Sequence, residues 1–384
     1  MSRKKCKPDR NVKQSKPLRF LLAIATAAGA SLAIAMAVSA YSSYFNPQDN
    51  RIIAVSGLLF PMLLGAHMLM TMVWLAWRKW TNLVLSLIVL AACGTQAYTF
   101  SPLNITKPIA VTEHEKQFTV LTYNVFGLWC FGNEVKNDTY NIAVSNILKA
   151  DADIVALQEC YGVDKNRALR ITEQQSDSIK ERYPYRSFSS RDVMLLSKYP
   201  ITESNDISGR NNNYSATRYS IDIDGRTISF YNIHLQSIGL SDDDKELYEN
   251  TIEGKNMPET RSEAKALAKD LKKHLYTKIA DAMSYRSKQA QDISELLRRE
   301  NGDVILCGDF NDTANSYAYR KIRGTMCDAY CDCGFGPTIT YHGNRFYLRI
   351  DHVLYQGAIR ATDIERPHFA SSDHYPLLAT FALE

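Results

Sequence analysis

The sequence predicts a layered α/β domain that follows an N-terminal region of three membrane-spanning helices. Three long apolar runs lie before residue 101. After about residue 116, short runs rich in β-branched and aromatic residues alternate with stretches of helical periodicity, as in a domain of strands and covering helices. Polar and acidic side chains stand at the ends of the predicted strands. These observations predict a membrane region and a layered domain with one site at its rim.

The three apolar runs occupy about residues 20–44, 52–77 and 82–100. A helix crosses a bilayer with about 20 mostly apolar residues, and roughly 17 is the lower limit. The first two runs meet this length, whereas the third needs its flanking Tyr98 and Phe100. A cleaved signal peptide is the alternative for the first run, because "AVSA" at 37–40 resembles a cleavage site. The length of that run and the two runs after it favour a membrane domain over residues 1–100.

Basic residues predict the orientation of these helices. Eight Lys and Arg side chains precede the first run, and Arg78 and Lys79 separate the second run from the third. Because Lys and Arg stay on the cytoplasmic side, we expect a cytoplasmic N-terminus. Three crossings then place everything after about residue 101 outside the cytoplasm. The expected location is the cell or inner membrane, with the later domain in the periplasm if the cell is Gram-negative.

The basic charge of the chain belongs to the membrane region. Residues 1–100 carry 11 Lys and Arg against 2 Asp and Glu, and the rest of the chain carries 34 against 39. The later domain is therefore acidic and has no bulk attraction for a polyphosphate backbone. A nucleic-acid partner is not favoured by this charge, although a local basic patch remains open. No protein partner is indicated.

Six cysteines lie in the part expected outside the cytoplasm, where disulfides persist: Cys130, Cys160, Cys307, Cys327, Cys331 and Cys333. Disulfides and buried free thiols both stay open as expectations. The spacing "CDAYCDC" at 327–333 is also seen in zinc sites, but no second cluster or His pair completes four ligands.

The later domain is expected to span residues 117–384, after a linker at 101–116. Apolar side chains at helical spacing predict helices over 138–150 and 287–301. Length and composition predict strands at 118–125, 153–159, 226–234, 303–311 and 346–355.

Side chains of types that can bind metals or phosphate groups end the first four predicted strands, lie within the fifth at Asp351, and recur near the C-terminus in "SSDHYPL" (371–377). Strand ends and their loops converge on one rim of a layered sheet, so we expect these side chains to face one cleft. Oxygen ligands without a thiolate favour Mg²⁺ or Mn²⁺ over zinc. The side chains are Asn124, Glu159, Asn232, His234, Asp309, Asn311, Asp351, Asp373 and His374.

The motifs that carry these side chains resemble, in the same order, those of the endonuclease/exonuclease/phosphatase superfamily. They are "YNV" (123–125), "LQE" (157–159), "NIHL" (232–235), "GDFN" (308–311), "RIDHVL" (349–354) and "SDH" (372–374). The resemblance covers about residues 116–383. It implies a four-layer α/β/β/α sandwich and metal-dependent hydrolysis of a phosphoric ester.

The resemblance also implies how the metal is held. Glu159 would be the principal ligand of one Mg²⁺ or Mn²⁺ ion, with Asn124 beside it. Asp373 would support the ion directly or through water. Apurinic endonucleases of this superfamily carry an acid two residues after the asparagine, where this chain has Phe126. That departure disfavours a strict apurinic-endonuclease function.

The catalytic roles follow from the same resemblance. Asp309 would orient or deprotonate the attacking water, and Asn311 would hold that water and a phosphate oxygen. His374, steadied by Asp351, would bind the phosphate and stabilise its developing charge. His234 would act on the phosphate or on the leaving group.

Two further residues are candidates for binding substrate. Asn232 lies at the same strand end as His234. Arg218 lies on a probable strand, where it either pairs with Asp222 or points towards the phosphate. The charged segment at 240–285 is either a solvated surface insertion or a lid over the cleft.

The predicted function is a membrane-anchored, divalent-metal-dependent phosphoesterase that hydrolyses a phosphodiester outside the cytoplasm. Tethering near a bilayer makes a phospholipid head group a plausible substrate, and another small phosphodiester is the other option. A nuclease that acts on DNA or RNA outside the cytoplasm is the alternative activity. The alternative class is a catalytically silent binding module on the same fold.

Overall fold

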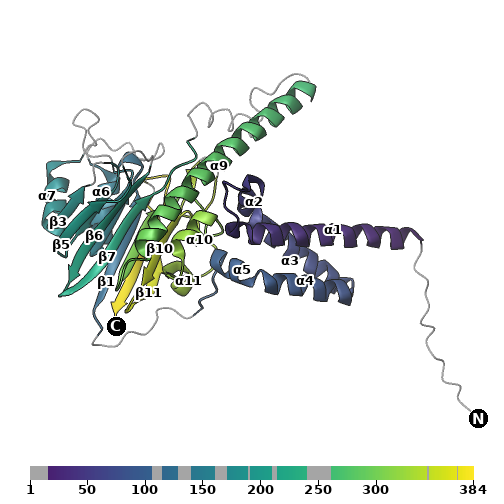
Figure 1. Cartoon of the computed structure of the whole chain (residues 1–384), viewed down its shortest axis with the longest axis horizontal. Coiled ribbons are helices and arrows are strands. Elements are labelled where there is room, and N and C mark those ends of the chain that lie inside the picture. Colours follow the sequence, from purple (N-terminus) through teal and green to yellow (C-terminus); the bar gives the residue numbers. More distant parts are fainter. Residues whose placement is uncertain are drawn as a thin grey trace, which may run out of the picture.

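The computed structural model describes residues 16–105, 115–128, 140–160, 171–188, 191–209, 214–239, 261–343, 346–369 and 371–384. A group of N-terminal helices extends from one side of a larger domain that is built from two sheets and several helices (Figure 1).

Each of the two sheets has six strands and mixes parallel with antiparallel pairs. The first has the order β11 (Ile359–Glu365), β12 (Leu377–Leu383), β1 (Gln117–Asn124), β2 (Ile154–Gln158), β4 (Met194–Ser197) and β3 (Tyr185–Phe188). The second has the order β5 (Ile201–Asp206), β6 (Ser215–Ile223), β7 (Arg226–His234), β8 (Val304–Asp309), β10 (Asp351–Gln356) and β9 (Cys327–Asp328).

The sheets pack face to face, and helices cover their outer faces. Phe118, Phe230 and Phe381 belong to the apolar core between the sheets. A second core lies between the second sheet and α9 (Arg261–Leu297) with α10 (Tyr317–Arg323). A third lies between the first sheet and α6 (Ile142–Ala150) with α7 (Glu173–Arg182). This is the α/β/β/α layering that the resemblance implies.

The central strands are buried on both faces, which explains their continuous apolar runs. All residues of β2 and β8 are buried. The strand expected at 346–355 begins only at Asp351, and the helix expected at 287–301 is the last part of the 37-residue α9. Residues 240–260, the first part of the charged insertion, lie outside the described residues, whereas 261–285 belongs to α9.

The N-terminal region contains two helical segments that are long and apolar enough to cross a membrane, Arg19–Tyr44 and Arg51–Ala76. The first consists mainly of α1 (Lys16–Ala40), with η1 (Ser42–Tyr44) at its end. The second joins α2 (Arg51–Ser56) through η2 (Gly57–Leu59) to α3 (Phe60–Ala76).

The third expected span is not one continuous helix. It is divided into α4 (Trp80–Ala92) and α5 (Gly94–Phe100), which meet at 60°. The break falls at Cys93 and Gly94, where glycine and the polar Thr95 and Gln96 interrupt the apolar run. The structure therefore has two unbroken candidate spans where three were expected, and the third region is a bent pair of helices.

The described cysteines that were expected outside the cytoplasm are Cys160, Cys307, Cys327, Cys331 and Cys333, and all are free thiols. Cys130 lies outside the described residues. In the described part of the chain, the expectation of buried free thiols therefore holds for all but the exposed Cys327.

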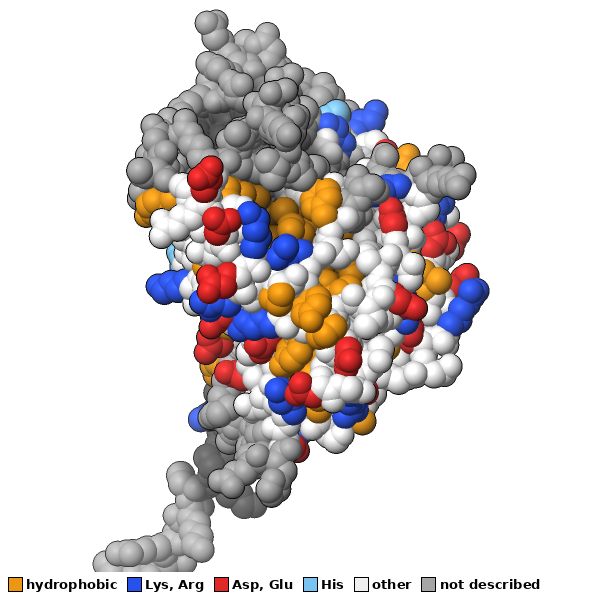
Figure 2. Space-filling view, turned by 90° about the vertical axis from the view of Figure 1, so that its left-hand side faces the viewer, with side chains coloured by type: hydrophobic (Ala, Val, Ile, Leu, Met, Phe, Trp, Pro, Cys, Tyr) orange, Lys and Arg blue, Asp and Glu red, His pale blue; other side chains and the backbone are white. Residues whose placement is uncertain are grey.

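The surface that carries α7, β3 and β5 has acidic and basic side chains intermixed around a band of apolar ones (Figure 2). Among the described residues on this face, Lys and Arg form no continuous track (Figure 2).

Candidate active site

The register of the second sheet sets His234, Asp309 and Asp351 side by side. His234 ends β7 and pairs with Asp309 at the end of the parallel β8. Asp351 begins β10 and pairs with Asp309 from the other side. Paired residues of neighbouring strands project to the same face of a sheet, so the three side chains meet at one end of the inter-sheet layer.

Asp309 is the centre of this group. Its carboxylate is 1% exposed and accepts hydrogen bonds from the side-chain amide of Asn124 at 2.9 Å and from the backbone N–H of Asn311 at 2.7 Å. Burial raises the pKa of Asp309, and the positive charges of His374 and His234 oppose that increase. A buried carboxylate after an apolar strand is thus stabilised by amides and imidazoles.

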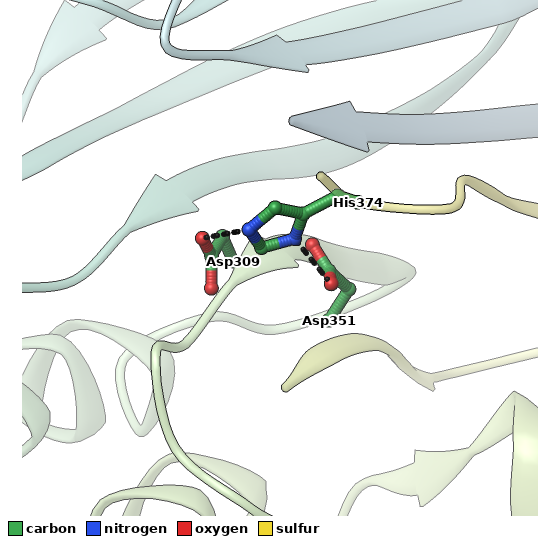
Figure 3. Close-up of side chains that lie close together, drawn as sticks. All are labelled: Asp309, Asp351 and His374. Carbon is green, nitrogen blue, oxygen red and sulfur yellow. Dashed lines mark hydrogen bonds and ion pairs between the residues drawn. The ribbon is translucent and has the colours of Figure 1, made fainter. Parts of the chain in front are cut away.

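His374 lies between two carboxylates (Figure 3). Its Nδ1 is 2.9 Å from Asp351 Oδ2, and its Nε2 is 3.6 Å from Asp309 Oδ2. Burial alone would lower the pKa of His374, but the charges of Asp351 and Asp309 outweigh burial and raise it to about 10. The ring is therefore an imidazolium at neutral pH, oriented by Asp351.

His234 is held in the same way by Asp192, a residue that is not among the predicted site residues. Its Nδ1 is 2.7 Å from Asp192 Oδ2, and its Nε2 lies 3.8 Å from Glu159 and 3.9 Å from Asp309. Burial opposes protonation, but the hydrogen bond and charge of Asp192 raise the pKa of His234 to about 9. The Nε2 atom is buried and has no hydrogen-bond partner among the described residues.

Glu159 and Asp373 add two carboxylates to the cavity. Glu159 accepts a hydrogen bond from the Asn124 amide at 3.1 Å and has φ of 51°, a backbone conformation unusual for this residue type. Burial, together with the charges of Glu159 and Asp309, raises the pKa of Asp373 to about 6, although His374 opposes the shift. Neighbouring carboxylates of this kind repel one another unless a cation separates them.

The oxygen-rich donor set fits a hard divalent cation. Asp309, Asp351 and His374 offer ligand atoms that all lie within 4.8 Å of one another. Both ring nitrogens of His374 already face carboxylates, so the ring offsets the charge of only one of them and is not free to bind an ion (Figure 3). Glu159 and Asp373 line the cavity with carboxylate oxygens, which are the atoms that Mg²⁺ and Mn²⁺ prefer.

Asn124 connects the carboxylates. Its side-chain nitrogen donates to Glu159 and Asp309, and its oxygen accepts from the backbone N–H of Phe126 at 3.1 Å. The expected ligand is thus placed as a bridge between Glu159 and Asp309. Asn311 also has φ of 50°, and its amide donates to the carbonyl of Leu235 at 2.9 Å.

Two candidates for substrate binding do not reach the cavity. Asn232 faces the same way as His234, but it lies two residues deeper between the sheets and is fully buried. Its amide accepts from Gln158 at 2.7 Å and donates to the carbonyls of Leu157 and Met194. Its side-chain amide is satisfied within the protein, so the structure does not bring Asn232 together with the residues that line the cavity.

Arg218 is on the opposite face of the second sheet. Its guanidinium is 2.5 Å from Glu300 and 3.5 Å from Glu203, and it donates to Ser229 at 2.8 Å. Neither expected role, a pair with Asp222 or a contact to phosphate, describes this position. The alternation of β6 places Arg218 on the α9 side, away from the layer between the sheets.

The cavity beside these groups has a volume of about 220 Å³. Its polar part is formed by Glu159, Asn311, Asp373 and His374, and Arg286 contributes a buried cation that pairs with Asp312 at 3.1 Å. Its apolar part is formed by Leu58, Phe126, Ile238, Ile279, Phe346, Leu348 and Ile350. The cavity is therefore lined by charged side chains in one part and by an apolar wall in the other.

Residues 121–374 match the model of the "Endonuclease/Exonuclease/phosphatase family". Residues 19–100 match a second family, described only as a domain of unknown function (DUF8431). No curated protein sequence matches the chain.

Solved structures of similar proteins include three at 16% identity. An endonuclease/exonuclease/phosphatase from Bacteroides vulgatus has a TM-score of 0.46, with 70% of this chain and 100% of that chain covered. The human Nocturnin catalytic domain with bound sulfate has a TM-score of 0.46, with 70% and 98% covered. D. rerio TDP2 complexed with a single-strand DNA product has a TM-score of 0.42, with 69% and 99% covered. The family assignment rests on the sequence match alone.

Proposed function

Because the chain belongs to the endonuclease/exonuclease/phosphatase family, we propose that it is a membrane-anchored, divalent-metal-dependent phosphodiesterase that acts outside the cytoplasm. The observation that supports this most strongly is the position of Asp309. It lies between two imidazolium rings, His234 and His374, and shares the amide of Asn124 with Glu159. This arrangement can bind an anionic ester and activate water in one place.

Hydrolysis of a phosphodiester requires charge neutralisation, a positioned water and a proton for the leaving oxygen. In the proposed reaction, His374 binds a non-bridging phosphate oxygen and Asn311 helps to position the water. Asp309 takes a proton from that water while the oxygen of the water forms a bond to phosphorus. The ester P–O bond breaks, and His234 donates a proton to the departing oxygen.

Glu159 would hold a Mg²⁺ or Mn²⁺ ion, supported by Asp373 and with Asn124 fixing the carboxylate. Such an ion neutralises phosphate charge and acts as a Lewis acid on a phosphate oxygen. The oxygen-only donor set and the raised pKa of Asp373, caused by burial and by nearby carboxylates, support this assignment. Phosphate binding, positioning of the water and both proton transfers are the roles of the protein side chains named above.

The membrane part of the proposal depends on Arg19–Tyr44 and Arg51–Ala76, with α4 and α5 as a broken third crossing. Basic residues before the first segment favour a cytoplasmic N-terminus, and the α/β domain then lies outside the cytoplasm. A phospholipid head group is the substrate that this position favours.

A nuclease is the second candidate. The relative from D. rerio is described with a single-strand DNA product. The acidic charge of residues 101–384 and the intermixed charges in Figure 2 do not favour long nucleic acids. A silent binding module is less well supported, because the acids and imidazoles needed for hydrolysis are all present.

A substrate panel on the purified full chain tests the proposal. It comprises bis-p-nitrophenyl phosphate, sphingomyelin, phosphoinositides, single-stranded DNA and plasmid, each assayed with Mg²⁺ and with EDTA. We expect EDTA-sensitive hydrolysis of bis-p-nitrophenyl phosphate and of at least one lipid. Cleavage of DNA alone would replace the proposal with the nuclease, and no cleavage of any probe would support the silent module.

A further inference from the structure

The helical region contacts the catalytic segment that follows Asp309. The side-chain amide of Asn315 donates to the carbonyl of Ser39 at 2.8 Å, and the Ser42 hydroxyl donates to the carbonyl of Asn315 at 3.3 Å. At Gly57, an added Cβ would lie 2.3 Å from Ser42 Oγ and 3.2 Å from the Asn315 carbonyl. Only glycine permits this close approach without a shift.

A second contact reaches the strand that begins with Asp351. Arg349 is 7% exposed and donates to the carbonyl of Thr99, near the end of α5, at 2.7 Å. The same guanidinium pairs with Asp328 at 3.2 Å. Arg349 stands two residues before the partner of His374, so α5 helps to fix the entry to that catalytic strand.

A third contact joins α2 to α9. Gln48, just before α2, donates to the hydroxyl of Ser287 at 2.9 Å, and Arg51 pairs with Asp281 at 2.6 Å. Ser287 follows Arg286, which lines the cavity. Figure 1 shows α2 beside α9, at the end of the helical group that meets the domain.

Leu58, from η2 of the helical region, contributes to the apolar wall of the cavity. Its side chain is half-buried, and the wall continues through Ile279 of α9 and through Phe346 and Leu348. This wall shares the cavity with the carboxylates and His374. An occupant that fills both parts carries an anionic phosphodiester and an apolar group.

We propose that the N-terminal helical region forms part of the active site and that Leu58 is a specificity-determining residue for the apolar part of the substrate. The inference deepens the proposed phosphodiesterase function and rests on it. The helices then do more than tether the enzyme: they supply one wall of the cavity and fix the segments that carry Asp309 and Asp351. The substrate class is a phosphodiester with an attached hydrocarbon chain.

Two chromogenic probes with the same leaving group test this inference on the full chain in detergent. They are methyl p-nitrophenyl phosphate and decyl p-nitrophenyl phosphate, and the readout is the ratio of their kcat/KM values. We expect the wild type to prefer the decyl probe and Leu58→Ser to reduce that preference about tenfold, as for the loss of an apolar contact. Leu58→Met should restore most of it.

Leu59→Ser is the matched control, because the neighbouring leucine is 51% exposed and does not line the cavity. It should keep the wild-type ratio. A wild type without preference, or a Leu58→Ser variant that loses both activities in equal proportion, would overturn the inference while leaving the phosphodiesterase intact. Hydrolysis of neither probe by the wild type would instead refute the proposed function, and the inference with it.

Discussion

Asp192 and His234 come from different sheets and form a hydrogen bond of 2.7 Å between the carboxylate and Nδ1. Asp192 precedes β4 of the first sheet, and His234 ends β7 of the second. On the other side of Asp309, Asp351 holds His374 at 2.9 Å. The site thus contains two imidazoles, each oriented through Nδ1 by its own carboxylate. Asp309 lies between the two Nε2 atoms.

Asp192→Asn should reduce kcat on bis-p-nitrophenyl phosphate by about 10²–10⁴ at neutral pH. The amide removes the charge that keeps His234 protonated and no longer fixes the tautomer of the ring. Asp177→Asn is the control, because that carboxylate is 72% exposed on α7 and pairs only with Lys180 in the described contacts. Equal rates for both variants would show that His234, as held by Asp192, takes no part in the reaction.

Asp309→Asn should reduce single-turnover hydrolysis by about 10²–10⁴, because the side chain can no longer accept a proton from water. The change preserves the shape of the side chain, so the far-ultraviolet circular dichroism should match that of the wild type. Asp224→Asn, in an exposed turn where asparagine tolerates the observed φ of 53°, serves as the control. A variant that keeps wild-type turnover would show that Asp309 does not act on the nucleophile.

Gly57→Val should lower the melting temperature of the full chain, because the new side chain meets Ser42 and Asn315. Overpacking of this kind costs about 1–3 kcal/mol. Gly65→Val is the matched control, since a Cβ at that glycine of α3 has no neighbour within 4 Å. If both variants melt at the same temperature, the contact between the helices and the catalytic domain is not tight.

The buried pair of Asp328 and Arg349 predicts a pH-dependent stability. Burial opposes ionisation of Asp328, but the charge of Arg349 and the hydrogen bonds from Tyr319 and Tyr330 outweigh it and lower the pKa. A carboxylate with a lowered folded-state pKa stabilises the fold above its unfolded-state pKa, and that stability is lost as pH falls through the folded-state value.

Asp328→Asn tests this dependence. Breaking a buried pair costs about 3–5 kcal/mol, so the variant should melt well below the wild type at pH 7. The gap should narrow as pH falls below about 4, because the carboxyl of the unfolded wild type then becomes protonated, and it should close as pH passes the lower pKa of the folded state. A gap of constant size across this range, measured by thermal denaturation, would show that ionisation of Asp328 does not stabilise the fold.

The order of polar strand ends predicts most of the cluster. His234, Asp309 and Asp351 meet because parallel β7 and β8 end together and β10 begins beside them. Glu159, after β2, and His374, before β12, reach the same cluster from the first sheet. Alternation along a strand gives the face of a side chain but not its depth. For this reason Asn232 was expected in the cavity and is instead buried between the sheets.

Other features depend on pairings that the sequence does not reveal. β4 was not predicted, and its pairing with β2 is what brings Asp192 to the site. The position of Arg218 depends on the register of β6 with β7, which directs its side chain towards Glu300. The sequence does not reveal that register. The carboxylate before the apolar run "VMLLS" (193–197) was the one available signal for Asp192.

A Mg²⁺ titration of the EDTA-treated full chain tests the central claim most directly, with bis-p-nitrophenyl phosphate hydrolysis as the readout. We expect EDTA to abolish turnover, Mg²⁺ or Mn²⁺ to restore it, and Glu159→Gln to require about 10–100-fold more Mg²⁺ for half-maximal activity. Full activity of the wild type in EDTA, or the same titration curve for Glu159→Gln, would contradict the assignment of a metal-dependent phosphodiesterase.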